Sequence, residues 1–159
     1  MKRLILIRHS DAESSSFGKE DHKRELTVDG IKKATERAAY LLNKKYLPDL
    51  ILSSDAVRAV QTAEVFANHL NQKCRIVNIP FLYFEYTTND FFNLISEIDD
   101  CYNTVFIIAH NPTLSVMASR LDDDALLHFN TCDIAIFEID KLWGSVEVDS
   151  CQLIDYVGS

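Results

Sequence analysis

The segment LILIRHSDAE, residues 4–13, joins a run of apolar side chains directly to two charged or polar ones. The run KRLILIR has the continuous hydrophobic character of a strand that is covered on both faces, as in a parallel sheet. It ends at Arg8 and His9. A second run, TVFIIAHNP at residues 104–112, ends in a similar way at His110. Two buried strands are therefore predicted to carry a histidine at their carboxyl ends.

Strand-like and helix-like segments alternate along the rest of the chain. Short apolar runs predict further strands at residues 49–53 and 74–79, and helical spacing predicts helices at residues 27–45, 54–70, 89–98 and 112–121. The third helix is expected to begin at Asn89 or Asp90. This alternation predicts a three-layer α/β/α fold with a mostly parallel sheet, in a single domain over residues 1–159. The last two apolar segments, residues 132–139 and 145–154, predict an antiparallel C-terminal hairpin at the edge.

Composition and charge disfavour several classes of protein. The net charge of −8 argues against nucleic-acid binding, which needs a basic face. No apolar run approaches the roughly 20 residues of a membrane span, and no signal segment is evident at the N-terminus. The four cysteines are widely spaced and form no C-x-x-C motif, which favours free thiols in a reducing compartment. We therefore expect a cytoplasmic protein that binds neither membranes nor nucleic acid.

Charged and polar residues gather where the predicted strands end. In an open parallel sheet, ligands bind beyond the carboxyl ends of the strands. The residues expected there are Arg8, His9, Ser10, Ser53, Ser54, His110 and Asn111, with Arg58 one turn into the following helix. Arginine forks match phosphate oxygens, and a neutral imidazole can attack phosphorus while a second, protonated histidine stabilises the charge on its oxygens. The pattern predicts a phosphoryl-binding pocket.

Two other interpretations fit the same residues. His9, Asp11 and His110 could ligate zinc or manganese in a metal-dependent phosphoesterase, although neighbouring arginines would repel a cation. The pocket could instead belong to a non-catalytic module that binds phosphorylated partners, although a binder has no need of a nucleophile. Each of these histidines and arginines, taken singly, is more typical of a surface hydrogen bond or ion pair than of catalysis. Their expected convergence favours a function.

Four sequence elements resemble, in order, those of the histidine phosphatase superfamily, in its phosphoglycerate-mutase-like branch. The family's strand and Arg-His-Gly motif correspond to LIRHSDAE, and its R-x-L-T-x-x-G element to RELTVDG at residues 24–30. Its S-S-x-x-x-R-x-x-Q-T-A element corresponds to SSDAVRAVQTA at residues 53–63, and its G-H-N-P element to AHNP at residues 109–112. Within the superfamily the chain is most similar to the small phosphohistidine phosphatases of the SixA type.

The resemblance implies a role for each matching residue. His9 corresponds to the nucleophile that becomes phosphorylated, and His110 to the second histidine of the pocket. Arg8 and Arg58 correspond to the arginines that hold the phosphoryl group, and Arg24 to a position that also reaches the phosphate. The resemblance implies a hydrolase without metal or other cofactor, which acts on a phosphorylated protein or a small phosphorylated molecule.

Serine and alanine stand at two positions where the family usually has glycine, Ser10 and Ala109, but neither change removes a reactive group. We expect Ser10 and Asn111 to contact the substrate.

Larger members place a carboxylic acid after the third strand, where it acts as a general acid, and Glu85 is the candidate here. Members of the SixA type manage without a strong acid, because the phosphorus–nitrogen bond is labile and needs little proton donation. The short chain also leaves little room for a lid over a small substrate. We therefore expect phosphohistidine on a partner protein, with a small phosphomonoester or a binding-only role as alternatives.

Overall fold

The protein forms one mixed sheet within the residues that the structure, a computed structural model, describes, which are 1–15 and 18–158. Its strands are β1 (Lys2–Arg8), β2 (Leu50–Ser53), β3 (Arg75–Asn78), β4 (Thr104–Ala109), β5 (Ile134–Ile139) and β6 (Gln152–Val157), in the order β3-β2-β4-β1-β5-β6. The first four in that order are parallel. β5 runs antiparallel to β1, and β6 antiparallel to β5.

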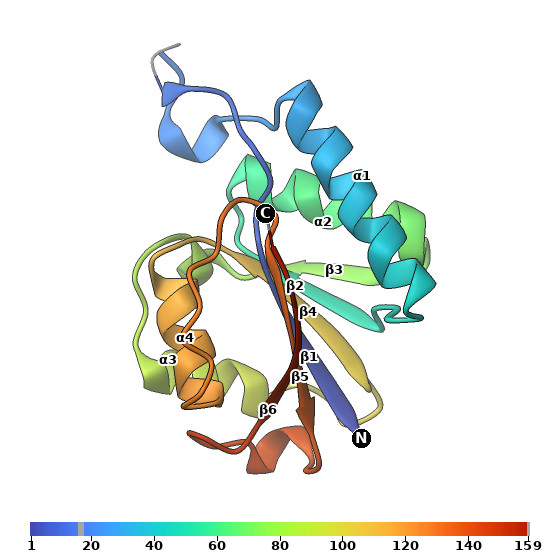
Figure 1. Cartoon of the computed structure of the whole chain (residues 1–159). Coiled ribbons are helices and arrows are strands. Elements are labelled where there is room, and N and C mark those ends of the chain that lie inside the picture. Colours follow the sequence, from blue (N-terminus) through green and yellow to red (C-terminus); the bar gives the residue numbers. More distant parts are fainter. Residues whose placement is uncertain (16–17, 159) are drawn as a thin grey trace.

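Helices cover both faces of this sheet, as Figure 1 shows. They are α1 (Val28–Asn43), α2 (Val57–Leu70), α3 (Thr88–Ser96) and α4 (Thr113–Leu121), with 3-10 turns η2 (Asp21–Lys23), η3 (Pro80–Tyr83) and η4 (Trp143–Ser145). Alternate residues of a strand face opposite sides. Accordingly, Ile5 and Ile7 pack with α1 and α2, while Leu4 and Leu6 pack on the side of α3 and α4. The expected three-layer α/β/α fold is confirmed, and burial on both faces explains the continuous apolar run of β1.

The third helix begins earlier than the sequence predicts. Thr87, not Asn89 or Asp90, is its N-cap, because the Thr87 hydroxyl accepts a hydrogen bond from the backbone N–H of Asp90. The Asp90 carboxylate in turn accepts from the backbone N–H of Thr87. This reciprocal pair is a capping box, which satisfies two backbone donors that would otherwise lack partners.

The second strand of the C-terminal hairpin is also displaced from its predicted position at residues 145–154. It is β6, and the segment before it does not pair with β5. The fully buried Trp143 inserts into the core, where its indole N–H donates to the carbonyl oxygen of Tyr102. The backbone N–H of Cys151 then bonds to Leu121, at the end of α4. Core packing of the tryptophan therefore moves the strand towards the C-terminus.

The strand register places the two predicted histidines side by side. Arg8 pairs with Ala109 across the parallel strands β1 and β4, so His9 and His110 follow at the same level. The backbone N–H of Ser54, just after β2, bonds to β4 as well. Three parallel strands thus end at one edge of the sheet. None of the helices in the described part of the chain is long and apolar enough to cross a bilayer.

Candidate active site

His9 is a buried, neutral imidazole with one defined tautomer. Its side chain is at the end of β1, and only 8% of the residue is exposed. The ring Nδ1 lies 2.7 Å from the carbonyl oxygen of Ser10. A carbonyl can only accept, so Nδ1 carries the proton and Nε2 keeps its lone pair. Burial, reinforced by the positive charges of Arg58 and Arg8, lowers the pKa of His9 to about 4.

Arg58, in the first turn of α2, places its guanidinium directly against this histidine. Its Nε lies 3.4 Å from Nε2 of His9. Its Nη1 donates to the backbone carbonyl of Asp21 at 2.8 Å, and its Nη2 to the Asp21 carboxylate at 3.1 Å. The guanidinium also lies over the ring of Tyr83, 5.9 Å from its centre. A fixed positive charge therefore faces the nitrogen that is free to react.

Arg8 contributes a second guanidinium from the last position of β1. Its Nη1 donates to the carbonyl oxygen of Phe129 at 3.0 Å, which fixes the side chain against the connection between α4 and β5, residues 122–133. Asn111 binds the same carbonyl oxygen through its Nδ2 at 2.8 Å. One backbone carbonyl thus orients two side chains that both line the cavity described below.

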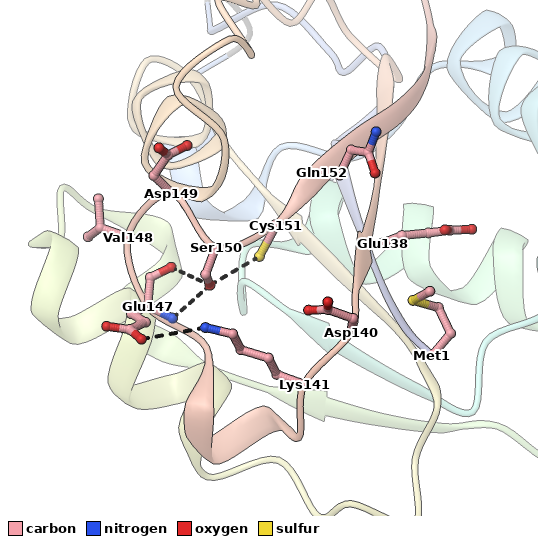
Figure 2. A pocket seen from close by; sticks show the side chains of 10 residues that line it. All are labelled: Met1, Glu138, Asp140, Lys141, Glu147, Val148, Asp149, Ser150, Cys151 and Gln152. Atoms are coloured by element: carbon pink, nitrogen blue, oxygen red, sulfur yellow. Dashed lines mark hydrogen bonds and ion pairs between the residues drawn. The ribbon is translucent and has the colours of Figure 1, made fainter.

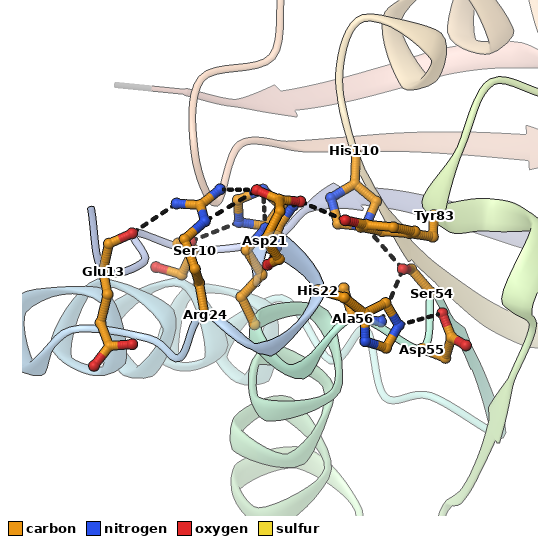
Figure 3. Close-up of polar contacts among 12 residues, drawn as sticks. Ser10, Glu13, Asp21, His22, Arg24, Ser54, Asp55, Ala56, Tyr83 and His110 are labelled. Atoms are coloured by element: carbon orange, nitrogen blue, oxygen red, sulfur yellow. Dashed lines mark hydrogen bonds and ion pairs between the residues drawn. The ribbon is translucent and has the colours of Figure 1, made fainter. Parts of the chain in front are cut away.

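His110 lies beside His9, with their ring centres 5.0 Å apart. Its Nε2 is 2.8 Å from the hydroxyl of Ser54. That hydroxyl oxygen also accepts from the backbone N–H of Ala56, and it can either donate to Nε2 or accept from it. Within the described residues the buried Nδ1 has no partner. Figure 3 shows it on the side of the ring that faces Asp21.

The pKa of His110 determines whether its ring is charged before a phosphoryl group binds. Burial, followed by the proximity of His9 and Arg58, lowers the pKa of His110 to about 3. The ring is therefore neutral in the free protein. A bound phosphoryl group would bring negative charge next to it, which raises the pKa of an adjacent imidazole.

These side chains line one cavity of about 380 Å³. Its lining residues are Arg8, His9, Asp11, Ala12, Arg24, Arg58, His110, Asn111 and Thr131. Three arginines and two neutral histidines give it a strongly cationic wall, which suits a phosphoryl group. The structure thus brings together Arg8, His9, Arg58 and His110, and adds Arg24 and Asn111 to the same wall.

A larger cavity of about 600 Å³ lies at the opposite end of the sheet, near Met1 (Figure 2). It is lined by several carboxylates, and its one lysine, Lys141, is paired with Glu147 at 3.5 Å. Negative side chains repel anions, so size is a poor guide to the phosphoryl site here. We assign the candidate active site to the smaller, cationic cavity.

Four residues that the sequence singled out do not line the cavity, namely Ser10, Ser53, Ser54 and Glu85. Ser10 is fully buried, and its hydroxyl donates to the carbonyl of Gly30 at 2.6 Å. Its part in the site is the backbone carbonyl that orients His9. Glu85 is exposed on the segment after η3 and is not among the residues that line the cavity.

Four residues were missed in the sequence, namely Ala12 and Thr131, which line the cavity, and Asp21 and Tyr83, which contact its arginines. Arg24 donates to the Asp21 carboxylate through Nε and Nη2, at 3.0 and 2.8 Å. The Tyr83 hydroxyl donates to the same carboxylate at 2.5 Å, as Figure 3 shows. The position of Asp21, three residues before Arg24, could have predicted an ion pair between the two side chains. Tyr83 gave no such signal, because only folding brings η3 beside η2.

The carboxylate of Asp11 is also committed to protein partners. It accepts a hydrogen bond from the Thr131 hydroxyl, and it lies 3.3 Å from Nζ of Lys33. Although burial acts against them, these two groups hold the pKa of Asp11 below its usual value. In the part of the chain that the structure describes, no three His, Cys, Asp or Glu side chains are grouped as ligands for a metal ion.

Comparison with known proteins agrees with this geometry. The family model of the histidine phosphatase superfamily, branch 1, matches residues 4–79, which include His9, Arg24 and Arg58. A structure assigned as the phosphohistidine phosphatase SixA of Agrobacterium tumefaciens is 26% identical, with a TM-score of 0.83, and the match covers 99% of this chain and 98% of that one. Nearly half of the chain thus matches the histidine phosphatase superfamily model, and almost the whole chain has the fold of this SixA structure.

Two further comparisons extend the match. The structure of the protein histidine phosphatase SixA complexed with tungstate is 22% identical, with a TM-score of 0.85, and the match covers 98% of this chain and 96% of that one. At that identity it supports the fold alone. An uncharacterised chloroplastic protein of Arabidopsis thaliana is 29% identical over 145 residues, and the match covers 86% of this chain. The chain spans 66% of the length of that relative.

Proposed function

We propose that this histidine phosphatase transfers a phosphoryl group to Nε2 of His9, releases it to water, and acts on phosphohistidine of a partner protein. The observation that carries the proposal is the hydrogen bond from Nδ1 of His9 to the carbonyl of Ser10. It leaves the Nε2 lone pair in the cavity, beside the guanidinium of Arg58. The similarity to SixA supports the same activity.

In the first step, Nε2 of His9 attacks phosphorus in line with the bond to the leaving nitrogen. The substrate ring carries a proton from solvent on its other nitrogen. As the Nε2–phosphorus bond forms, the substrate's phosphorus–nitrogen bond breaks, and the substrate ring keeps that bonding pair and leaves as a neutral imidazole. Arg8, Arg58 and His110 stabilise the equatorial oxygens during transfer. The Nδ1–H of phosphorylated His9 still donates to the Ser10 carbonyl, which holds the ring in place.

In the second step, water attacks the phosphorus from the side that the leaving group has vacated. The bond to Nε2 breaks, inorganic phosphate departs, and His9 returns to its neutral tautomer. The same arginines serve both steps, because the charge on the phosphoryl oxygens is similar in both transition states.

Proton donation separates phosphohistidine from ordinary phosphoesters as the substrate. The carboxyl groups at the cavity are poor acids, because the pKa of Asp11 and that of Asp21 are both lowered and both groups are ionised. Glu85 does not line the cavity. An alkoxide leaving group needs a proton from the enzyme, whereas a phosphohistidine needs far less help. The site therefore favours a phosphorus–nitrogen bond.

A protein partner is favoured by the surface beside the cavity. Phe84 is 71% exposed and packs on Tyr83, with ring centres 4.5 Å apart. Tyr83 in turn contacts the ring of His110. An exposed aromatic side chain next to a reactive site suits contact with another protein's surface.

The free cysteines Cys74, Cys101, Cys132 and Cys151 support a cytoplasmic location.

The cations that the chain supplies support a mechanism without a metal ion. Arg8, Arg24 and Arg58 line the cavity and would repel a divalent ion. The positive charge that a metal would bring to the phosphoryl oxygens is already present on these side chains.

The test is phosphate release from a histidine-phosphorylated carrier protein in the presence of a chelator. The wild-type protein should release phosphate and His9→Ala should not, because the substitution removes the nitrogen that forms the covalent intermediate. His69→Ala is the matched control, since His69 is an exposed residue of α2 outside the cavity. It should match the wild type.

Other results would redirect the proposal. An active His9→Ala variant would reject His9 as the nucleophile. Activity that disappears in chelator and returns with added zinc or manganese would support the metal-dependent alternative. Turnover of small phosphomonoesters alone would identify a small-molecule phosphatase, and binding of phosphate without any turnover would identify a binding module.

A further inference from the structure

The Asp21 carboxylate occupies a cluster of four hydrogen-bond donors at the mouth of the cavity. Its Oδ1 accepts from Nε and Nη2 of Arg24, at 3.0 and 2.8 Å. Its Oδ2 accepts from Nη2 of Arg58 at 3.1 Å and from the Tyr83 hydroxyl at 2.5 Å. These donors come from Arg24 just after η2, from Arg58 in α2 and from Tyr83 in η3, so the fold assembles them from three separate parts of the chain. We call them the four-donor cluster.

The four-donor cluster has the composition of an oxyanion site. Two guanidinium groups and a hydroxyl surround a group with one negative charge and two oxygens. Arginine forks bind carboxylates and phosphates with the same geometry, so a carboxylate can stand where a phosphoryl oxygen would bind. Arg24 and Arg58 both line the catalytic cavity, so the cluster and the cavity share their cations.

Asp21 differs from a carboxylate that serves as a structural support. Its side chain is 51% exposed, and it belongs to the short turn η2 in the connection between β1 and α1. Asp133, by contrast, is 1% exposed and ties Arg37 and Tyr156 together in the interior. An exposed carboxylate on a connecting turn can leave its donors for water at little cost, whereas a buried one cannot.

We propose that the four-donor cluster is part of the binding site for the phosphoryl oxygens, and that Asp21 is its internal occupant, which an incoming phosphoryl group displaces. The inference rests on the proposed phosphatase function. It assigns Tyr83 as a further ligand of the anion, and it makes Asp21 a competitor that weakens the binding of every oxyanion. A phosphoryl group with two negative charges competes better than a singly charged anion, so the competition favours the substrate over weaker anions.

A binding measurement on inorganic tungstate tests the competition directly. Isothermal titration calorimetry would compare the wild-type protein with Asp21→Asn, which keeps the shape of the side chain and removes its charge. We expect tungstate to bind the variant about ten-fold more tightly, because an occupied site lowers apparent affinity by the fraction of molecules in which it is free. Weaker or unchanged binding would overturn the proposal, since it would mean that Asp21 positions Arg24 and Arg58.

Glu20→Gln is the matched control for charge. Glu20 precedes Asp21, is exposed, and lies 3.8 Å from Lys23 without touching either arginine. The substitution removes the same charge at nearly the same place, so it should leave tungstate affinity unchanged. An equal gain in both variants would reject a specific competitor and indicate a general effect of net charge.

The role of Tyr83 needs the Asp21→Asn background, where its hydroxyl is available to the added anion. There, Tyr83→Phe should weaken tungstate binding several-fold. An unchanged affinity would remove Tyr83 from the site. A circular dichroism spectrum and a melting curve for each variant separate lost binding from lost folding.

Binding and turnover answer different questions. If Asp21→Asn binds tungstate more tightly and the wild-type protein releases phosphate from no substrate, Asp21 is an internal competitor but the protein is not a phosphatase. If the wild-type protein turns over its substrate and Asp21→Asn gains no affinity for tungstate, the protein is a phosphatase but Asp21 is not a competitor.

Discussion

Nε of Arg58 lies 3.4 Å from Nε2 of His9, and the two side chains come from different strand–helix units of the fold. The contact places a fixed positive charge beside the atom proposed to bond to phosphorus. It also helps to keep the ring unprotonated, because a neighbouring cation disfavours a second positive charge. One arginine therefore affects both the reactivity of the histidine and the binding of the phosphoryl group.

Removal of that arginine should reduce turnover far more than it reduces stability. Arg58→Ala is expected to lower kcat about 10²–10³-fold, by analogy with the loss of one donor to a developing oxyanion. Arg58→Lys should recover only part of the rate, because an ammonium group lacks the planar fork. Steady-state phosphate release measures the effect. Arg75→Ala is the control, because Arg75 is exposed on the edge strand β3. A comparable fall in kcat for Arg75→Ala would show that the effect at Arg58 does not depend on its contact with His9.

Ser54 should act through the orientation of His110. Ser54→Ala leaves Nε2 of His110 without its partner, which should cost about 1–3 kcal/mol of transition-state stabilisation, the penalty for an unsatisfied buried polar group. We expect the loss in kcat rather than in KM, and recovery in Ser54→Thr. Ser53→Ala is the matched control, since Ser53 is equally buried and its hydroxyl donates to a backbone carbonyl instead. Equal losses in both alanine variants would argue against a role for the orientation of His110.

The two buried histidines should become protonated well below neutral pH. NMR titration of the ring protons should place His9 near pKa 4 and His110 near pKa 3, since burial disfavours the charged ring. In the unfolded chain both would titrate near 6.5. Between about pH 6.5 and 4 the unfolded state therefore binds more protons, so the free energy of unfolding falls as the pH is lowered.

The slope of that loss is a second measurement of the same effect. Each histidine contributes at most about 1.4 kcal/mol per pH unit to the free energy of unfolding in this window. Urea unfolding at several pH values should show a shallower slope for His9→Asn than for the wild type. Identical slopes for the two proteins would show that His9 is not held neutral by burial.

Gly30 should reverse the usual effect of a glycine-to-alanine change in a helix. Alanine normally stabilises a helix interior by about 1 kcal/mol relative to glycine. A Cβ at Gly30, however, would lie 2.1 Å from the carbonyl oxygen of Asp11. Gly30→Ala should therefore destabilise the protein by about 1–3 kcal/mol, as overpacking does. Gly144→Ala, where the nearest atom would be 3.9 Å away, is the control for urea unfolding, and a gain in stability at Gly30 would contradict the close approach.

Local sequence was a sound guide to the elements and a poor guide to their ends. The alternation of apolar runs and helical spacing predicted the three-layer fold correctly, because periodicity reports which faces are buried. Thr87 and β6 were misplaced for a different reason. Thr87, Asn89 and Asp90 are all residue types that can cap a helix, so the sequence does not identify which of them forms the capping box. The start of β6 depends on where Trp143 enters the core.

The sequence by itself determined that strands β1 and β4 end in His9 and His110, and that arginines follow in a phosphatase-like order, because strand ends and motif spacing are local properties of the chain. Only the tertiary structure decided the tautomer of His9, the charge of each histidine, the exclusion of Glu85 from the cavity, and the occupation of Arg24 and Arg58 by Asp21. These properties depend on burial and on contacts between segments distant in sequence, such as η2 with η3, and those arise only when the chain has folded.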